Sequence, residues 1–190
     1  MRRSREEKAR TRKRIVAAAS RLFRARGVQE VSVADVMSAV GLTVGGFYRH
    51  FPNKEALVAE AIDAASVESS ERMRATLAAK RPLEAIVEAY FSTEHLENAA
   101  DGCPVAALCS DVGREGRPTR AAFTLALRRV LALVDAAIPG SSAAARERRL
   151  HAVAAAVGGL VLARASDDDR LAQEILSAVR RRLLDENRRA

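Results

Sequence analysis

The side chains with the clearest chemistry lie close together, between Ser32 and Lys54. Their hydroxyl, guanidinium, imidazole and ammonium groups can donate hydrogen bonds to phosphate oxygens and to the edges of nucleic-acid bases. Arg49 is the best candidate for a bidentate pair with guanine, and Lys54 opens a predicted helix whose N-terminus would strengthen a phosphate contact. For His50, an ordinary solvated side chain is an equal alternative. The residues that we expect to contact DNA are Thr43, Val44, Gly45, Gly46, Tyr48, Arg49, His50 and Lys54.

Two short helices, predicted over residues 33–40 and 44–51, must position these side chains. Gly41 ends the first of them in a tight turn. Phe47 and Phe51 are four residues apart, so they share the inward face of the second helix and leave the candidate residues on its outer and flanking faces. A helix presented in this way fits the major groove of DNA. The predicted N-cap residues of the two helices are Ser32 and Thr43.

Two glycines stand inside the second of these helices. Gly45 and Gly46 weaken it by roughly 1 kcal/mol each relative to alanine. They would let the backbone approach DNA closely, but they leave few side chains to read bases. We therefore expect affinity to come mainly from phosphate contacts, with base reading concentrated in Arg49.

Positive charge is concentrated at the N-terminal end of the chain. Residues 1–54 carry thirteen Lys or Arg and four acidic residues, a net charge of +9, whereas residues 55–190 carry nineteen basic and twenty acidic residues, a net charge of −1. A basic module on a near-neutral body is typical of a protein with a polyanionic partner. We therefore predict a DNA-binding domain at residues 1–54 and a second domain at residues 55–190.

The whole chain is predicted to be helical. It is rich in alanine and charged residues, with 4% aromatic residues and no Trp, and it shows neither a strand pattern nor a repeat. A first helix, over residues 5–26, places apolar side chains on one face and Arg and Lys on the other. Further helices are predicted over residues 54–79, 82–98, 103–115, 118–138, 142–165 and 168–187, which gives about nine in all.

Other classes of protein find little support in the sequence. Cys103 and Cys109 form no disulfide framework and no metal-ligand pattern, and the three His residues are far apart in the chain. There is no nucleophile–base set and no glycine-rich phosphate loop after a strand, so we expect no enzyme, no metal and no cofactor. The longest apolar run, near residues 152–163, is too short to span a membrane, and the absence of a signal peptide favours the cytoplasm.

The region around the two short helices resembles the N-terminal domain of TetR-family transcriptional regulators. That family has a basic helix, a helix-turn-helix and then the pattern Tyr-x-x-Phe-x-x-Lys, which Tyr48, Phe51 and Lys54 match here, with Gly41 in the turn. The resemblance covers about residues 12–60. It implies an all-α homodimer that binds double-stranded operator DNA and represses transcription until a small-molecule effector releases it. An activator remains an alternative.

The resemblance also implies that the C-terminal domain binds the effector and forms the dimer. The last two long helices, over residues 143–165 and 168–187, would pair with those of a second copy; packing within one protomer is the alternative. The expected interface residues are Val153, Val157, Leu160, Val161, Ile175 and Val179. The expected pocket residues are Tyr90, Phe91, Glu94, His95, Cys103, Leu108, Phe123, Leu127 and Val130, any one of which could instead be ordinary core.

Cys103 suggests a second mode of regulation. It opens a predicted helix, where the helix dipole favours the thiolate, and its Gly-Cys-Pro context resembles family members that respond to electrophiles or oxidants. A redox- or electrophile-sensing regulator is therefore one hypothesis, and a small buried hydrophobic cysteine is the other. A helical adaptor whose head no longer binds DNA is a further alternative, against which the charge of the head argues.

Overall fold

The computed structural model describes the backbone of residues 2–188 and the side chains of residues 5–186. Over this range the chain is built of helices with no strand, which confirms the expected all-α fold. Met1, Arg189 and Ala190, and the side chains of Arg2 and Arg3 that contribute to the predicted basic segment, lie outside the described residues. The α-helices are α1 (Arg2–Arg26), α2 (Val33–Ala39), α3 (Lys54–Arg74), α4 (Pro82–Tyr90), α5 (Thr93–Glu97), α6 (Pro104–Val112), α7 (Arg117–Ala137), α8 (Ala143–Ala165) and α9 (Asp169–Arg188). The 3₁₀ helices are η1 (Val44–Arg49), η2 (Ala75–Ala78) and η3 (Ala99–Asp101).

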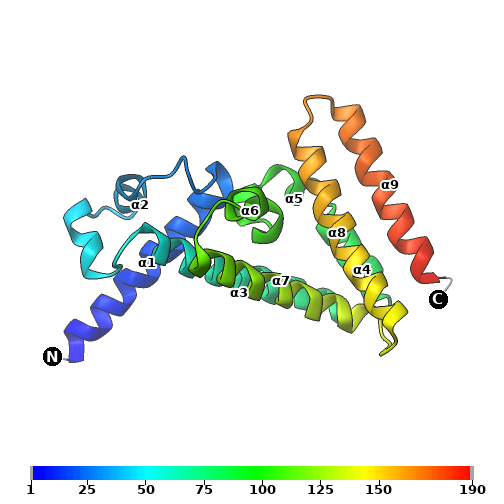
Figure 1. The fold of residues 1–190 in the computed structure, drawn as a ribbon, viewed down its shortest axis with the longest axis horizontal. Coiled ribbons are helices and arrows are strands. Elements are labelled where there is room, and N and C mark those ends of the chain that lie inside the picture. The colour runs from blue at the N-terminus through cyan, green and yellow to red at the C-terminus, as the bar shows by residue number, and fades with distance from the viewer. Residues whose placement is uncertain (1, 189–190) are drawn as a thin grey trace.

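A small head, made of α1, α2 and η1, lies at one end of an elongated molecule (Figure 1). The Ser32 hydroxyl accepts a hydrogen bond from the amide of Asp35, and the Asp35 carboxylate accepts one from the amide of Ser32, so a reciprocal capping box begins α2. Gly41 has a φ of +70°, a left-handed conformation that glycine adopts without steric cost, and it turns the chain toward η1. The structure thus confirms Ser32 as an N-cap and Gly41 as the turn residue.

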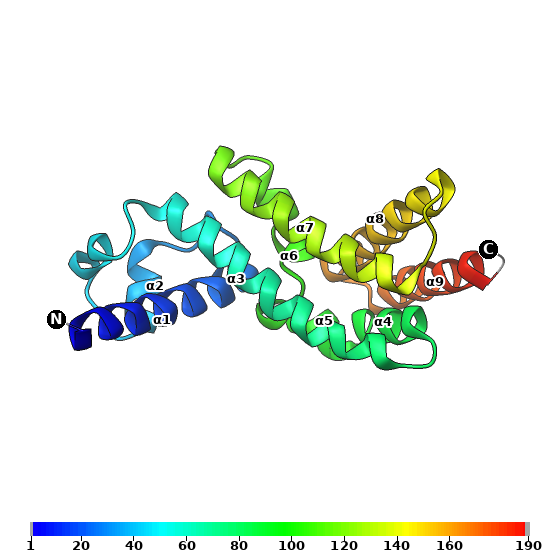
Figure 2. The ribbon, with the colours of Figure 1, turned by 90° about the horizontal axis from the view of Figure 1, so that it is seen from below.

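The body extends from the head along α3 and α7, which run side by side (Figures 1 and 2). Buried alanines on the two helices, Ala61 on α3 and Ala122 and Ala126 on α7, belong to the same hydrophobic cluster. Small side chains of this kind let helices approach closely, which gives the alanine-rich composition a structural use. At the far end α8 and α9 pack together as a hairpin, and α9 leads to the C-terminus.

One hydrophobic core joins the head to the body. The same cluster contains Phe23 of α1, Phe47 of η1, Leu57 of α3, Leu108 of α6 and Leu160 of α8. The head therefore packs directly on the body, so a movement in one can be transmitted to the other through packed side chains. The division of the chain at residue 54 stays a prediction.

The helix expected over residues 44–51 is instead the 3₁₀ helix η1. Its backbone bonds run from Gly46 N to Thr43 O and from His50 N to Phe47 O, each spanning three residues. Two adjacent glycines make an α-helix costly here, which accounts for the tighter and shorter form. The predicted N-cap is also wrong in one respect, because the Thr43 side chain makes no capping hydrogen bond.

Three other helices end earlier than predicted. The helix expected over residues 82–98 is divided into α4 and α5, because the Ser92 hydroxyl accepts a bond from the amide of His95 and caps a new helix. The helix expected over residues 54–79 is α-helical only to Arg74 and continues as η2. The helix expected over residues 103–115 is α6, which ends at Val112.

Candidate DNA-binding surface and ligand cavity

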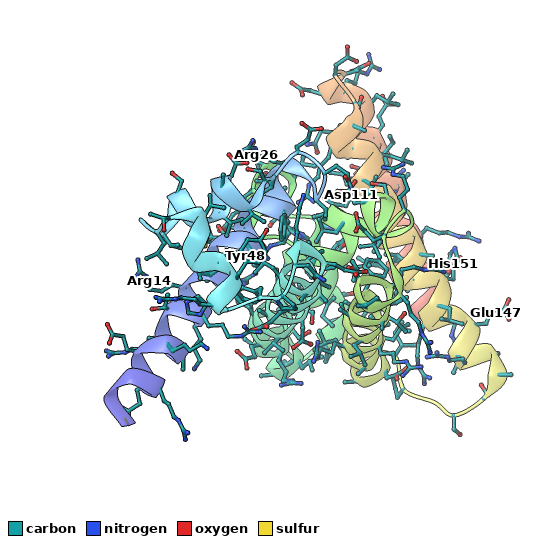
Figure 3. All side chains as sticks on the ribbon, turned by 60° about the vertical axis from the view of Figure 1, so that its left-hand side comes forward. Arg14, Arg26, Tyr48, Asp111, Glu147 and His151 are labelled. Atoms are coloured by element: carbon teal, nitrogen blue, oxygen red, sulfur yellow. The ribbon has the colours of Figure 1, made fainter. Side chains whose placement is uncertain are left out.

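The outer face of η1 is open to solvent. Tyr48 has 68% of its surface exposed, and Thr43, Val44, Gly45 and Arg49 are also exposed. Figure 3 shows Tyr48 at the same end of the molecule as Arg14 of α1. Opposite this face, Phe47 and Phe51 are buried and stacked on each other. The structure therefore exposes five of the eight predicted contact residues on one surface, with an apolar anchor behind them.

Arg12 holds this surface in place. Its guanidinium lies 4.1 Å from the centre of the Phe51 ring, donates to the carbonyl oxygen of His50, and pairs with Glu60 of α3. These contacts join α1, the end of η1 and α3 around one planar cation. From the sequence Arg12 was only one of many positive charges, and no local signal distinguishes it from its neighbours.

His50 is partly withdrawn from the surface. Its Nδ1 is buried without a hydrogen-bond partner among the described residues. Burial lowers the pKa of His50, and the nearby cations Lys8, Arg12 and Arg49 lower it further. His50 is thus neutral near pH 7, and only its other ring nitrogen remains for the predicted contact with DNA.

Lys54 has an internal partner. Its Nζ donates to the carbonyl oxygen of Val28 at 2.7 Å and so ties the start of α3 to the segment after α1. An ammonium group has three donors, so a phosphate contact would share Lys54 with this carbonyl. Asn53 caps α3, since its side-chain oxygen accepts from the amide of Ala56 at 2.8 Å.

Exposed cations surround η1. The exposed basic side chains of α1 that lie nearest its N-terminal end are Arg5, Lys8, Arg10, Lys13 and Arg14. Arg14 also donates to the carbonyl oxygen of Val40 at the end of α2, at 2.8 Å. A positive surface of this kind attracts a polyanion by release of counterions, whatever its sequence.

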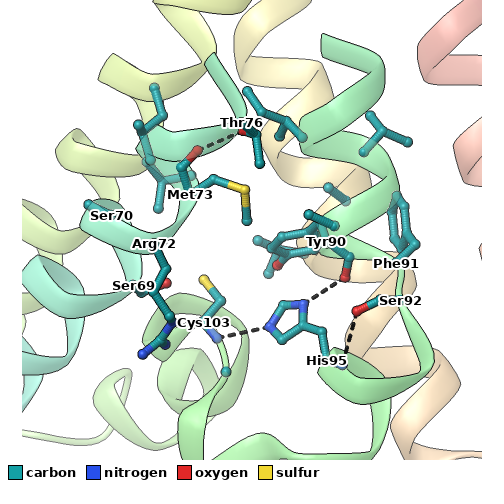
Figure 4. Close-up of a pocket in the computed structure, with 18 of the residues that line it drawn as sticks. Ser69, Ser70, Arg72, Met73, Thr76, Tyr90, Phe91, Ser92, His95 and Cys103 are labelled. Atoms are coloured by element: carbon teal, nitrogen blue, oxygen red, sulfur yellow. Dashed lines mark hydrogen bonds between the residues drawn. The ribbon is translucent and has the colours of Figure 1, made fainter. Parts of the chain in front are cut away.

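A cavity of about 490 Å³ lies in the body, between α3, α4, α7 and α8 (Figure 4). Six of the nine predicted pocket residues line it: Tyr90, Phe91, Glu94, His95, Cys103 and Val130. Leu108, Phe123 and Leu127 do not, because Leu108 is buried in the main core and the other two pack against that core. The sequence analysis missed the apolar face of α4, although its i, i+3, i+4 spacing is visible at Leu83, Ile86 and Val87.

One end of the cavity is built around His95. Its Nε2 accepts a hydrogen bond from the backbone amide of Cys103 at 2.9 Å, so the ring proton is on Nδ1, which donates to the carbonyl oxygen of Tyr90 at 2.6 Å. Burial lowers the pKa of His95, which keeps the ring neutral. Figure 4 shows this ring between Tyr90 and Cys103. His95 thus joins the end of α4 to the start of α6.

Cys103 lies at the N-cap position of α6, as predicted, but it is only 4% exposed. Burial raises the pKa of its thiol, because desolvation outweighs the hydrogen bonds from backbone amides of α6. The premise that the helix dipole favours a thiolate is therefore not met. Electrophile sensing by Cys103 stays a hypothesis, and the structure favours the alternative of a small buried side chain.

The segment between α5 and α6 connects the cavity to the head. Gly102 and Cys103 line the cavity, and the carbonyl oxygen of Gly102 accepts a hydrogen bond from Arg24 of α1 at 2.8 Å. Arg24 is only 3% exposed, and Arg21 of the same helix pairs with Asp101. Two arginines of α1 are thus bonded directly to the cavity wall.

Two of the six predicted dimer residues, Val153 and Leu160, are buried within the protomer. Leu160 is fully buried in the core, Val153 and Val157 line the cavity, and Val179 of α9 packs against Gly159 of α8. The assignment of Val153 and Leu160 to a dimer interface is wrong, because the apolar face of α8 that contains them is covered within the protomer. Val161 and Ile175 are half-buried. The residues that α8 leaves exposed at helical spacing are Leu150, Ala154 and Leu162.

Two kinds of site are not found within the described residues. No helix in this part of the chain is long and apolar enough to cross a membrane. No group of three or more His, Cys, Asp or Glu side chains is placed to hold a metal ion in the described residues.

Part of the chain is similar in sequence to known bacterial regulators. The family model for bacterial regulatory proteins of the tetR family matches residues 15–61. The transcriptional regulator TtgR of Pseudomonas putida is 43% identical over 63 residues, which are 33% of this chain and 30% of that protein. The match thus spans less than a third of the relative.

Solved structures show the same fold over almost the whole chain. A TetR transcriptional regulator from Legionella pneumophila has a TM-score of 0.76 at 17% identity and covers 91% of this chain and 95% of its own. The reduced form of NemR from Escherichia coli has a TM-score of 0.71 at 20% identity, covering 89% and 95%. The proteins from Pseudomonas putida and Legionella pneumophila are both described as transcriptional regulators. Residues 15–61 thus match the model of the tetR family, and the fold of the whole chain is similar to that of solved TetR-family structures.

Proposed function

We propose that this chain is a DNA-binding repressor of transcription, and that a small molecule in the cavity releases it from its operator. The observation that carries the proposal is the exposed face of η1, with Tyr48 and Arg49 outward and basic residues of α1 around it. A structural role alone would not require exposed aromatic and basic groups on an otherwise well-packed head. A major groove would accept this face, with phosphates along its flanks.

The path from cavity to head supports release by an effector. Asp101 and Gly102 contact the cavity on one side and α1 on the other, through Arg21 and Arg24. A ligand that displaces this segment would rotate or shift α1, which carries both η1 and the basic side chains. Release requires a ligand that binds the DNA-bound and the released conformations with different affinity. Because the cavity wall is bonded to the head, a different position of the head would change the cavity and so the affinity for the ligand.

The active form is proposed to be a homodimer. Leu162 has 59% of its surface exposed, and with Leu150 and Ala154 it forms an apolar stripe along the outer face of α8. A second copy packed on this stripe would remove it from water and place two heads on the same side. Two half-sites about 34 Å apart on a palindromic operator suit such a pair of heads.

Anisotropy of a fluorescent duplex from the chain's own upstream region tests DNA binding. We expect specific binding that a scrambled duplex of equal length lacks, and that falls steeply between low and physiological salt. Arg49→Ala should weaken it by roughly 1–3 kcal/mol. The matched control is Arg170→Ala, an exposed arginine of α9 at the other end of the molecule, which should bind as tightly as the wild type. Equal losses in both variants, or binding that does not depend on salt, would contradict the proposal.

The direction of regulation needs a separate assay. If the chain is a repressor, a reporter gene under the same upstream region should be expressed more strongly when the gene for this chain is deleted. Lower expression on deletion would identify an activator and contradict the proposed sign, while leaving DNA binding itself intact.

A further inference from the structure

We propose that the cavity takes a neutral, largely apolar small molecule that carries one hydrogen-bonding group, and that the hydroxyl of Tyr90 holds this group. The inference rests on the proposed function only for the role of the ligand as effector; the binding itself is a property of the cavity. Three observations lead to it: the partners of the charged lining residues, the state of the Tyr90 hydroxyl, and the apolar faces of α4, α7 and α8.

Three charged residues of the lining, Glu68, Arg72 and Asp101, have partners within the protein. Glu68 pairs with Arg72 at 2.6 Å, and Arg72 also donates to the backbone of Asp101. The Asp101 carboxylate pairs with Arg21. These charges are already compensated, so none of them offers a counterion to a ligand. A charged ligand inside an apolar cavity would lose its hydration without a compensating partner, at a large cost in free energy.

Glu94 is the lining acid that has no side-chain partner among the described residues, and it is exposed to solvent. An exposed carboxylate is well hydrated and screened, so it attracts a ligand in the interior only weakly. The titratable groups deeper in the wall are uncharged near pH 7. Burial lowers the pKa of His95, raises that of Cys103, and raises that of Tyr90 well above its ordinary value.

The Tyr90 hydroxyl is the polar group left for a ligand. Tyr90 is 8% exposed and lines the cavity, and its hydroxyl oxygen has no hydrogen-bond partner in the described structure. The neighbouring Cys103 thiol contributes to the raised pKa of Tyr90, but a thiol is only a weak hydrogen-bonding group and does not replace the stronger bond that a ligand would make. Buried hydroxyls are nearly always paired, since an unpaired one destabilises the fold. A ligand that forms a hydrogen bond with this hydroxyl removes the cost in stability of leaving it unpaired. A phenylalanine at position 90 would not have this cost at all.

The rest of the wall is apolar. Ile86 and Val87 of α4, Val134 of α7, and Val153 and Val157 of α8 all face the cavity. Its volume of about 490 Å³ lies within the range of cavities that hold drug-sized ligands. Contact with these side chains supplies affinity in proportion to the apolar area of the ligand, and Tyr90 supplies orientation.

A series of probes with the same eight-carbon chain tests the charge of the ligand. Isothermal titration calorimetry of the whole protein at pH 7.5, without DNA, would compare 1-octanol, octanoate and octyltrimethylammonium. We expect octanol to bind at least ten times more tightly than either ion. Equal or tighter binding of the cation would show that Glu94 and the aromatic rings make a cation site, and equal or tighter binding of the anion would show an unrecognised positive group. Either result, or no binding of octanol, would overturn the inference.

Tyr90→Phe tests the hydroxyl, and Tyr48→Phe is its matched control because these are the two tyrosines of the chain. Tyr90→Phe should weaken octanol binding about five-fold, the effect of one neutral hydrogen bond, without lowering the melting temperature of the free protein. Tyr48→Phe should leave octanol binding unchanged. Unchanged octanol binding in Tyr90→Phe, or a lower melting temperature of the free variant, would overturn the role of the hydroxyl. Because DNA is absent, failure here is distinct from failure of the proposed repressor function.

Discussion

Replacing Gly45 by alanine should make the protein more stable and a poorer DNA binder. A Cβ atom built on Gly45 meets nothing within 4 Å, and the backbone there does not have a positive φ. Nothing in the fold therefore requires glycine at this position. If glycine is needed, the requirement comes from a partner that approaches the exposed backbone of η1.

The expected size of the stability change follows from the backbone. Alanine at a compatible position stabilises a protein by about 0.4–1 kcal/mol, because it reduces the conformational entropy of the unfolded chain. For a chain of 190 residues this raises the melting temperature by about 1–4 °C. Gly41→Ala is the matched control: there too the Cβ meets nothing, but φ is +70°, so the same substitution should destabilise by about 1–2 kcal/mol.

The effect on DNA follows from the close approach of the backbone. An added methyl group on the outer face of η1 would hold the helix away from the groove and weaken the contacts of Tyr48 and Arg49 together. We expect a loss of affinity of about tenfold or more, the scale of one lost base or phosphate contact. The assay is anisotropy of the labelled upstream duplex, combined with thermal unfolding of the same samples.

Two results would refute this reasoning. If Gly45→Ala binds DNA as tightly as the wild type, the backbone of η1 does not approach DNA closely. If Gly45→Ala lowers the melting temperature, the glycine serves the fold, and its absence of neighbours in the structure has been misinterpreted.

Three further predictions concern the body. Arg24→Met should destabilise the protein by about 1–3 kcal/mol in urea unfolding, because it leaves the buried carbonyl of Gly102 unpaired; a change below 0.5 kcal/mol would contradict its role as the link to α1. Burial lowers the pKa of His95, so the unfolded chain binds its proton more readily, and stability should fall as the pH drops below about 6.5. His95→Gln should reduce this dependence in melting curves at pH 5–8, while His50→Gln removes the contribution of half-buried His50, whose pKa is also lowered and which has the same sign. Leu162→Glu should give a monomer in sedimentation with an unchanged fold, and a dimer that persists would exclude the exposed stripe of α8 as the interface.

The helix-turn-helix could be predicted from the sequence because its signals are local. Ser32 caps α2, Gly41 has the left-handed turn conformation, and Phe47 and Phe51 anchor the inner face, each within a few residues of its effect. The same locality explains the error in the form of η1. Helical spacing is similar in α and 3₁₀ helices, so the pattern alone does not show how the glycines tighten the turn.

The cavity and the dimer face depended on contacts between distant segments. Six of the residues predicted for a pocket line the cavity, but the sequence could not show that Val153 of α8 faces the cavity or that Leu160 lies in the core. A helix with apolar residues on more than one side does not indicate which side its own protomer covers. Only the packing of α8 against α7 and α9 decides this, and it leaves Leu162 outward.

The sequence by itself determined that the chain is helical, basic at its N-terminal end, and built around an exposed helix-turn-helix. Periodicity, charge and caps are properties of neighbouring residues, so they are present before the chain folds. Only the tertiary structure decided which arginines do more than carry charge. Arg12 holds the exposed face of η1 in place, and Arg24 connects α1 to the cavity wall. Both contacts form because folding brings α1 against Phe51 and Gly102.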